Sequence, residues 1–208
     1  MNIALVIISA VVCYLFGSIN SLIIVGKCFK LGDIRQHGSG NAGATNALRV
    51  LGKKAAVFTL LGDIVKTVIA VLIAKLIVRF INDAFLAEFS LYLSCFATAL
   101  GHNYPVFFKF RGGKGVLTSG VIIIMLSPVI GGVTVLCCVL VIALTRYVSL
   151  GSMTGGVLYP IWIILYYPSN IMKIIFAVIL GGMLIIKHSA NIKRLISGTE
   201  SKLGAKKA

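Results

Sequence analysis

Long apolar runs alternate with short polar connections along the whole chain. Each run approaches the roughly 20 apolar residues that a helix needs to cross a bilayer. We predict seven transmembrane helices, at about 3–25, 56–80, 85–101, 115–131, 132–148, 151–168 and 171–188. Only turn-forming residues around Ser127–Gly132 separate the fourth from the fifth, and their combined length of roughly 34 residues favours two spans over one. The pattern predicts an all-α membrane protein, a polytopic bundle forming a single transmembrane domain over residues 1–208.

Composition and charge support this prediction and add an orientation. The chain is 59% hydrophobic and 12% charged, whereas soluble domains carry roughly 25% charged residues. Lys and Arg total 20 against five Asp and Glu, and most of these cations fall in 26–55, 102–114, 145–150 and the end of the chain from 187. With seven spans these four segments share one face, which the positive-inside rule makes cytoplasmic. We predict an N-terminus outside and a cytoplasmic basic tail over 189–208, with a lipid bilayer and no nucleic acid as partner.

The first cytoplasmic connection, Gly38–Arg49, is rich in glycine, small hydroxyl residues and asparagine. Such a segment can turn consecutive backbone N–H groups and side-chain donors inward, which makes a concavity for an anion. Arg49 adds a guanidinium that can bind a phosphate through two parallel hydrogen bonds. The pattern predicts a phosphate cradle. The alternative is an ordinary loop, since Gly, Ser and Asn also favour turns.

The second connection, Gly101–Gly115, combines glycines, aromatic residues and cations. Arg111 and Lys114 flank a glycine pair that lets the backbone approach a ligand closely. It is not a Walker A loop, because Gly115 follows Lys114 where Ser or Thr is required. We interpret it as a second anion site or as the other wall of the first. The alternative is an aromatic and basic anchor that sets topology.

Three further groups of polar residues carry weaker signals. Ser149 and Ser152 can cap a helix. His188, Asn191 and Arg194 fall on roughly one helical face beyond the last span, where they can close a site or bind lipid headgroups. Within the second span, Asp63 and Lys66 are three residues apart, and we interpret them as a structural ion pair. We expect no metal, because the histidines lie in separate segments without cysteines at ligand spacing, and we expect no cofactor.

Several motifs in order along almost the whole chain resemble the bacterial integral-membrane acyl-phosphate:glycerol-3-phosphate acyltransferases. The matching residues are Ser39–Asn46 with Arg49, Gly101-His102 with Pro105–Phe108, Gly112–Gly115, Ser149–Gly151, His188 with Asn191, Ile192 and Arg194, and Glu200. Asn20 stands where the family usually has Pro, and Ala42 where Pro or Ile is common. We expect these departures to affect the bend of the first helix and the rigidity of the loop, and not the chemistry.

The resemblance implies transfer of a fatty acyl group from acyl phosphate to the 1-hydroxyl of sn-glycerol 3-phosphate. The products are lysophosphatidic acid and phosphate, and the reaction begins bacterial phospholipid synthesis at the cytoplasmic (inner) membrane. Acyl phosphate is already activated, so we expect direct transfer without an acyl-enzyme. The His–Asp pair of other glycerophosphate acyltransferases is absent, because Ala42, Phe107 and Lys193 occupy the fifth position after the three histidines. A soluble acyl-phosphate synthase is an implied upstream partner.

The resemblance and the motifs together give a set of expected site residues. We expect acyl phosphate to be held by Ser39, Asn41, Thr45 and Lys114, with Gly40, Gly43 and Asn46 completing the substrate-binding loop. We expect glycerol 3-phosphate to be held by Arg49, Lys114, Ser152, His188 and Asn191, with Arg194 and Glu200 in support. The proton acceptor is left open between His188, His102 and a substrate phosphate oxygen. The alternative function is a transporter or channel for an anionic metabolite, which usually shows repeats or broken helices near the membrane centre.

Overall fold

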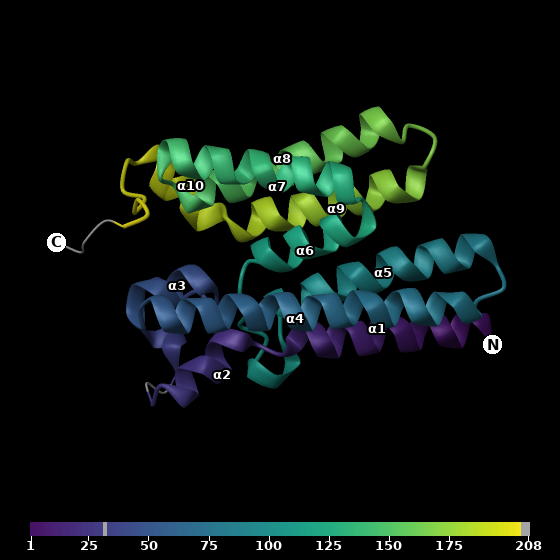
Figure 1. Ribbon diagram of the computed structural model, residues 1–208, viewed down its shortest axis with the longest axis horizontal. Coiled ribbons are helices and arrows are strands. Elements are labelled where there is room, and N and C mark those ends of the chain that lie inside the picture. The colour runs from purple at the N-terminus through teal and green to yellow at the C-terminus, as the bar shows by residue number, and fades with distance from the viewer. Residues whose placement is uncertain (31–32, 205–208) are drawn as a thin grey trace. The chain divides into compact units, whose positions relative to one another are not determined.

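The computed structural model describes residues 1–30 and 33–204, and it confirms the all-α prediction, since no strand occurs in these residues. Ten α-helices follow one another in this part of the chain (Figure 1): α1 Asn2–Ser18, α2 Ser21–Cys28, α3 Ala44–Val50, α4 Lys53–Ile77, α5 Ala84–Asn103, α6 Val116–Leu126, α7 Pro128–Thr145, α8 Val148–Tyr166, α9 Ile171–Lys187 and α10 Ser189–Ile196. Three short 3-10 helices add η1 Ile34–Gln36, η2 Val78–Phe80 and η3 Val106–Phe108.

Five apolar helical segments of the described chain are long enough to cross a membrane: Asn2–Cys28, Lys53–Phe80, Ala84–Phe108, Pro128–Thr145 and Val148–Tyr166. The helices α9 and α10 form a pair bent by 57° that adds a sixth if it is one span. The remaining apolar helix, α6, has 11 residues and is about 16 Å long, well short of a hydrocarbon core about 30 Å thick. The break after α6 falls at Ser127, earlier than the predicted boundary at 131, because Pro128 begins α7. The count of seven spans and the orientation of the termini stay predictions.

The chain divides into two compact units, Met1–Ile122 and Ile123–Ala208, and each is described by itself. In the first unit, α1 packs along α5 and α4, while α2 and α3 pack against α4. Gly17 and Gly101 bring the backbones of α1 and α5 together, since a Cβ at Gly101 would lie 2.8 Å from the Ser18 nitrogen. Small residues at such crossings let membrane helices approach closely.

The predicted first helix over 3–25 is in fact two helices, α1 and α2, with a break at Ile19 and Asn20. Asn20 caps α2, because its Oδ1 accepts a hydrogen bond from the Ile23 nitrogen at 3.1 Å. The Lys66 ammonium of α4 donates to the carbonyl oxygens of Gly17 at 3.1 Å and Ile19 at 2.5 Å. Backbone groups freed by a break at membrane depth need such partners, because no water is there to replace them. The break therefore persists with Asn at the position where the family usually has Pro.

In the second unit, α8 packs between α7 and α9 through glycines. A Cβ at Gly151 would lie 2.6 Å from the Cys138 carbonyl oxygen of α7, and one at Gly156 would lie 3.1 Å from the Gly181 oxygen of α9. The chain after α10 returns to the junction of α7 and α8, where the Leu203 nitrogen donates to the Arg146 oxygen at 2.7 Å. The predicted basic tail over 189–208 thus begins as a helix and is then tied to the unit as far as 203, and its residues 205–208 lie outside the described chain.

Candidate active site

The glycine-rich loop before α3 is organised around one buried side chain, Asn46. Its Oδ1 accepts hydrogen bonds from the Ser39 nitrogen at 2.9 Å and the Ser39 hydroxyl at 3.1 Å, and its Nδ2 donates to the His37 carbonyl oxygen at 3.1 Å. Gly38 and Gly40 have φ of +66° and +71°, a backbone conformation that glycine adopts at little cost. Asn46 and the two glycines therefore fix the shape of the loop.

The groups that this loop exposes are those expected to bind a phosphate. Ser39, Gly40, Thr45 and Arg49 are exposed, while Asn41 and Gly43 are half-buried. Arg49 lies in the last turn of α3, close in sequence to the buried Asn46 that holds the loop. We call residues 38–49 the cradle from here on. Asn46 differs from the other expected contacts, since its amide is engaged inside the cradle and shapes it.

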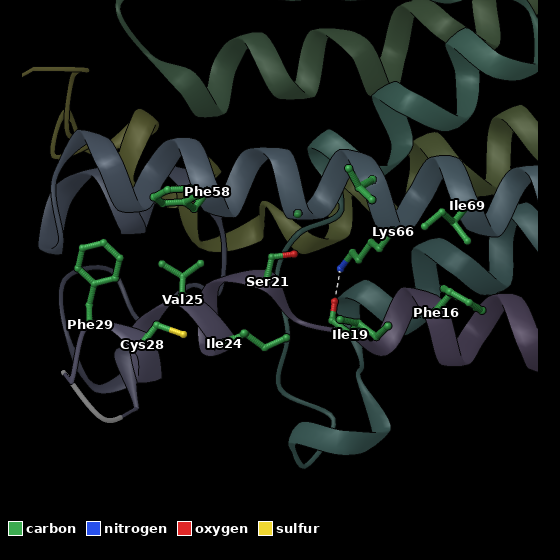
Figure 2. A pocket seen from close by; sticks show the side chains of 12 residues that line it. Phe16, Ile19, Ser21, Ile24, Val25, Cys28, Phe29, Phe58, Lys66 and Ile69 are labelled. Carbon is green, nitrogen blue, oxygen red and sulfur yellow. Dashed lines mark hydrogen bonds between the residues drawn. The ribbon is translucent and has the colours of Figure 1, made fainter.

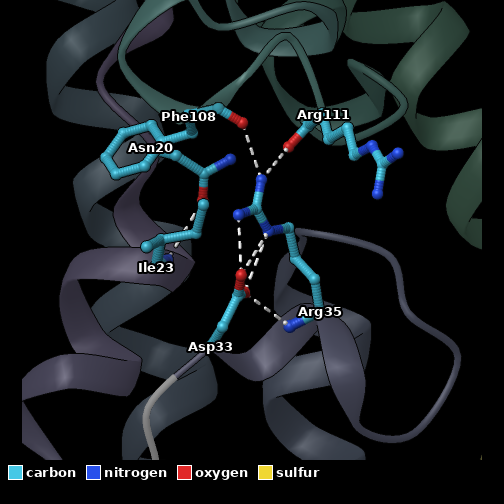
Figure 3. Close-up of polar contacts among 6 residues, drawn as sticks. All are labelled: Asn20, Ile23, Asp33, Arg35, Phe108 and Arg111. Carbon is cyan, nitrogen blue, oxygen red and sulfur yellow. Dashed lines mark hydrogen bonds and ion pairs between the residues drawn. The ribbon is translucent and has the colours of Figure 1, made fainter.

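A salt bridge that the sequence analysis did not single out lies just before the cradle (Figure 3). The Arg35 guanidinium bonds both carboxylate oxygens of Asp33, with Nη2 to Oδ2 at 2.7 Å and Nε to Oδ1 at 2.9 Å. Its Nη1 donates to the carbonyl oxygens of Phe108 at 2.7 Å and Arg111 at 3.0 Å. The hydrogen bonds from Arg35 hold the pKa of the Asp33 carboxyl below its usual value, and the Asp33 carboxylate raises the pKa of Arg35. Arg35 thus links the first connection to the second.

The second connection folds back on the end of α5 and brings Lys114 near the cradle. The nitrogens of Gly112 and Gly113 donate to the carbonyl oxygens of Asn103 at 3.2 Å and His102 at 3.1 Å. A Cβ at Gly113 would collide with the His102 ring and would lie 3.0 Å from the Ala42 carbonyl oxygen of the cradle. Only glycine fits there, and the half-buried Lys114 follows directly. Within the first unit, the structure therefore brings together the two connections that the sequence marked as anion sites.

His102 lies beneath the glycine pair in a buried polar network. Its Nδ1 is 3.1 Å from the Lys66 Nζ, which in turn lies 3.0 Å from Asp63 Oδ1. The Ser21 hydroxyl donates to the same carboxylate oxygen at 2.8 Å. The predicted Asp63–Lys66 ion pair is therefore present, with both side chains only 4% exposed.

An apolar cavity of about 600 Å³ extends from this network between α1–α2 and α4 (Figure 2). Phe16 and Ile69 line it near Lys66, and Phe29 and Phe58 line its other end. Its volume lies in the range of small-molecule sites, which span about 300–1,000 Å³.

The second unit holds its own cluster, centred on the carboxylate of Glu200. Ser149 donates to Oε1 at 2.6 Å, Asn191 Nδ2 to Oε1 at 2.7 Å, and Arg194 Nε to Oε2 at 2.7 Å. Burial of this carboxyl opposes its ionisation, but the three hydrogen bonds outweigh burial and lower the pKa of Glu200. Ser149, for which the sequence suggested a helix cap and a match to a family motif, binds an acidic residue 51 positions further on. No local pattern signals a pair so far apart.

Two expected site residues of the second unit are buried beside this cluster. The His188 Nδ1 lies 2.8 Å from the Leu184 carbonyl oxygen, which can only accept, so Nδ1 carries a proton and Nε2 is the acceptor whenever the ring is neutral. Ser152 is 3% exposed and donates to the Val148 carbonyl oxygen at 2.8 Å. The second unit therefore brings together His188, Asn191, Arg194 and Glu200 at the junction of α9, α10 and the returning chain.

The comparisons with known proteins show the family of the chain. The family model for glycerol-3-phosphate acyltransferase matches residues 7–198. The glycerol-3-phosphate acyltransferase of Clostridioides difficile strain 630 is 46% identical over 208 residues, which is the full length of both chains. This chain belongs to the glycerol-3-phosphate acyltransferase family.

Two solved structures agree with this assignment. The crystal structure of PlsY, an integral membrane glycerol 3-phosphate acyltransferase, in its glycerol 3-phosphate form is similar with a TM-score of 0.85, 35% identity and 96% of each chain covered. Its lysophosphatidic acid form gives 0.83 at 34% identity, covering 96% of this chain and 95% of the other. The family expected from the motifs is confirmed, and the protein is a multi-pass membrane acyltransferase.

Proposed function

We propose that this acyltransferase uses acyl phosphate as donor and transfers its fatty acyl group to the 1-hydroxyl of sn-glycerol 3-phosphate. The observation that carries the proposal is the cradle, whose exposed donors lie beside the glycine pair that leads to Lys114. The names of the two solved relatives support glycerol 3-phosphate as substrate and lysophosphatidic acid as product. The reaction would begin phospholipid synthesis at the bacterial cytoplasmic membrane.

The choice of acyl phosphate as acyl donor rests on the hydrogen-bonding groups that the cradle exposes. An acyl phosphate carries its own phosphate next to the reacting carbonyl, and backbone N–H groups, hydroxyls and a lysine suit that group. We assign Ser39, Asn41, Thr45 and Lys114 to this phosphate, with Gly40 and Gly43 supplying close backbone approach. An acyl-phosphate donor also requires an enzyme that makes it, so a soluble acyl-phosphate synthase is the expected upstream partner.

The residues that bind the acyl acceptor, glycerol 3-phosphate, are assigned by charge and by hydrogen-bonding capacity. We assign Arg49 and Lys114 of the first unit to the phosphate of glycerol 3-phosphate. For His188, Asn191 and Ser152 of the second unit, contact with this substrate is what the resemblance implies. Glu200 and Arg194 act on Asn191 by holding it, since Asn191 Nδ2 donates to Glu200 at 2.7 Å and Arg194 bonds the same carboxylate.

Transfer is a single displacement at the acyl carbonyl carbon. The 1-hydroxyl oxygen of glycerol 3-phosphate forms the new C–O bond, the C–O bond to phosphate breaks, and the electron pair leaves with inorganic phosphate. Cations at the phosphates stabilise the charge that develops on the leaving group. Because the anhydride is already activated, positioning replaces covalent catalysis.

The hydroxyl proton passes to His188 Nε2 or to a phosphate oxygen. His188 fits a base, because its Nδ1 is engaged with a backbone carbonyl and Nε2 is the acceptor of the neutral ring. His102 fits less well. Its Nδ1 lies 3.1 Å from the Lys66 ammonium, so a positive charge already stands beside the ring and disfavours its taking up a proton.

The direct test compares donors with the purified protein. We expect labelled glycerol 3-phosphate to enter lysophosphatidic acid with palmitoyl phosphate and not with palmitoyl-CoA. Product from palmitoyl-CoA alone would contradict the donor assignment. No product from either, with the protein shown to be folded, would overturn the proposed function.

A matched pair of lysine variants tests the site. We expect Lys114→Ala to abolish transfer, as we expect of Arg49→Ala, because each removes a cation from a substrate phosphate. Lys54→Ala removes the same charge from an exposed position in the first turn of α4 and should keep the wild-type rate. A folded Lys114→Ala protein with wild-type rates would remove Lys114 from the site.

A further inference from the structure

The turn that precedes Lys114 has a strained backbone. Lys109 and Phe110 have φ of +57° and +56°, values that side-chain-bearing residues seldom adopt. The Phe110 nitrogen bonds back to the Pro105 carbonyl oxygen at 3.0 Å, which closes the turn. Two of its carbonyl oxygens, those of Phe108 and Arg111, accept hydrogen bonds from Arg35. A strained conformation persists only where surrounding contacts determine it, and Arg35 supplies two of them.

Arg35 itself is rigidly held. Its side chain is 19% exposed, and Asp33 receives its Nε and Nη2, which leaves Nη1 aimed at the turn (Figure 3). The Arg35 carbonyl oxygen also lies 3.3 Å from where a Cβ of Gly40 would stand. One residue thus contacts the strained turn through its side chain and packs against the cradle through its backbone.

We propose that Arg35 is a positioning residue for acyl transfer, which holds the turn 105–111 so that Lys114 is kept beside the cradle. The proposal rests on the proposed function, because it takes Lys114 as a phosphate contact. Arg35 does not touch substrate in this scheme. Its effect passes through the turn and then through Gly112 and Gly113 to Lys114.

The contacts explain why arginine is needed. A planar guanidinium presents five N–H donors in a fixed fork and can bond a carboxylate and two carbonyls at once. A lysine ammonium keeps the charge but cannot span the same set of acceptors. Arg35→Lys should therefore lose nearly as much acyl-transfer activity as Arg35→Gln. If Arg35 acted only as a positive charge, lysine would restore the activity.

The test combines a measurement of the turn with a measurement of catalysis. Trypsin cleaves after lysine and arginine, so fragments ending at Lys109 or Arg111 report opening of the turn. In detergent-solubilised protein we expect Arg35→Lys to speed these cleavages about tenfold or more. Steady-state kinetics, normalised to folded protein, should show KM for glycerol 3-phosphate rising and kcat/KM falling at least about tenfold, since small misplacements of a catalytic group are costly. Lys27→Gln changes an exposed cation of α2 and should leave both readouts unchanged.

Each outcome bears on the proposal. Faster cleavage with a raised KM supports it. Unchanged cleavage in Arg35→Lys overturns it, because the turn then does not depend on the clamp. Faster cleavage with unchanged KM and kcat also overturns it, because the turn would then be held for stability alone. Failure of the proposed function looks different, since the wild-type protein itself would then form no lysophosphatidic acid from palmitoyl phosphate.

Discussion

Lys66→Met is the substitution for which the structure gives the clearest expected magnitude. The Lys66 ammonium is buried and contacts four groups: Asp63, His102, and the carbonyl oxygens of Gly17 and Ile19 at the break between α1 and α2. Methionine fills a similar volume but removes the charge and every donor. The Asp63 carboxylate then stays buried beside the Ser21 hydroxyl at 2.8 Å and the His102 Nδ1 at 3.8 Å, and the two carbonyls lose their bonds to Lys66.

The cost follows from removing one side of a buried ion pair. Leaving the other charge uncompensated costs about 3–5 kcal/mol. The double variant Asp63→Leu, Lys66→Met removes both charges, and the Gly17 and Ile19 carbonyls, the Ser21 hydroxyl and His102 each lose a hydrogen bond, at about 1–3 kcal/mol each. We therefore expect the double variant to be less destabilised than the sum of the two single variants, by at least about 2 kcal/mol.

The assay is reversible unfolding in mixed micelles, with helix content followed by circular dichroism. Lys54→Met serves as control, because Lys54 is exposed in the first turn of the same helix and should change stability by less than about 0.5 kcal/mol. A loss below about 1 kcal/mol for Lys66→Met, or strict additivity in the double variant, would refute the view that Lys66 satisfies the broken span.

Three further predictions follow from the site. Asn46→Ala removes three hydrogen bonds of about 1 kcal/mol each, so steady-state kinetics should show a clearly raised KM for acyl phosphate; an unchanged KM would show that the cradle keeps its shape without Asn46. The lowered pKa of Glu200 means that its stabilisation is complete above the unfolded pKa of about 4.3 and is lost as pH falls through the folded value. The gap in unfolding temperature between wild type and Glu200→Gln should thus shrink from pH 7 towards pH 3, and a constant gap would contradict the role of the ionised carboxylate. Direct transfer predicts that labelled inorganic phosphate does not enter palmitoyl phosphate without glycerol 3-phosphate, whereas incorporation would indicate an acyl-enzyme.

The features that depend on local composition could be predicted from the sequence. Apolar runs predicted the membrane helices, and the order of the motifs predicted the family, which the comparisons confirm. The ion pair of Asp63 and Lys66 followed from helical spacing, and it is present. The cradle was marked by its glycines, whereas the hydrogen bonds by which Asn46 holds the loop from inside were not foreseen.

What the sequence did not reveal depends on contacts between distant segments. The break at Asn20 is stabilised by a lysine 47 positions after Ile19, and the turn at 105–111 is held by an arginine 73 positions before Phe108. Arg35 was counted among the cations that set topology, and nothing in its neighbourhood distinguishes it from them. The fourth helix was predicted to run to 131, whereas α6 ends at Leu126, because Pro128, the second of the turn-forming residues, already begins α7.

The three clusters share one feature: in each, one of the few carboxylates of the chain binds a cation. The chain has five Asp and Glu against 20 Lys and Arg, and Asp33, Asp63 and Glu200 each bind one cation: Arg35, Lys66 and Arg194. Each pair stabilises an irregular part of the fold: the strained turn, the break between α1 and α2, and the returning C-terminal segment. Because the described carboxylates pair with only a few of the cations, most Lys and Arg remain available. Such a surplus of positive charge suits the binding of two anionic substrates at a membrane surface. Adding a carboxylate to the cradle should therefore compete directly with substrate phosphate, so Thr45→Asp should weaken binding of acyl phosphate more than Thr45→Asn does, in steady-state measurements of KM.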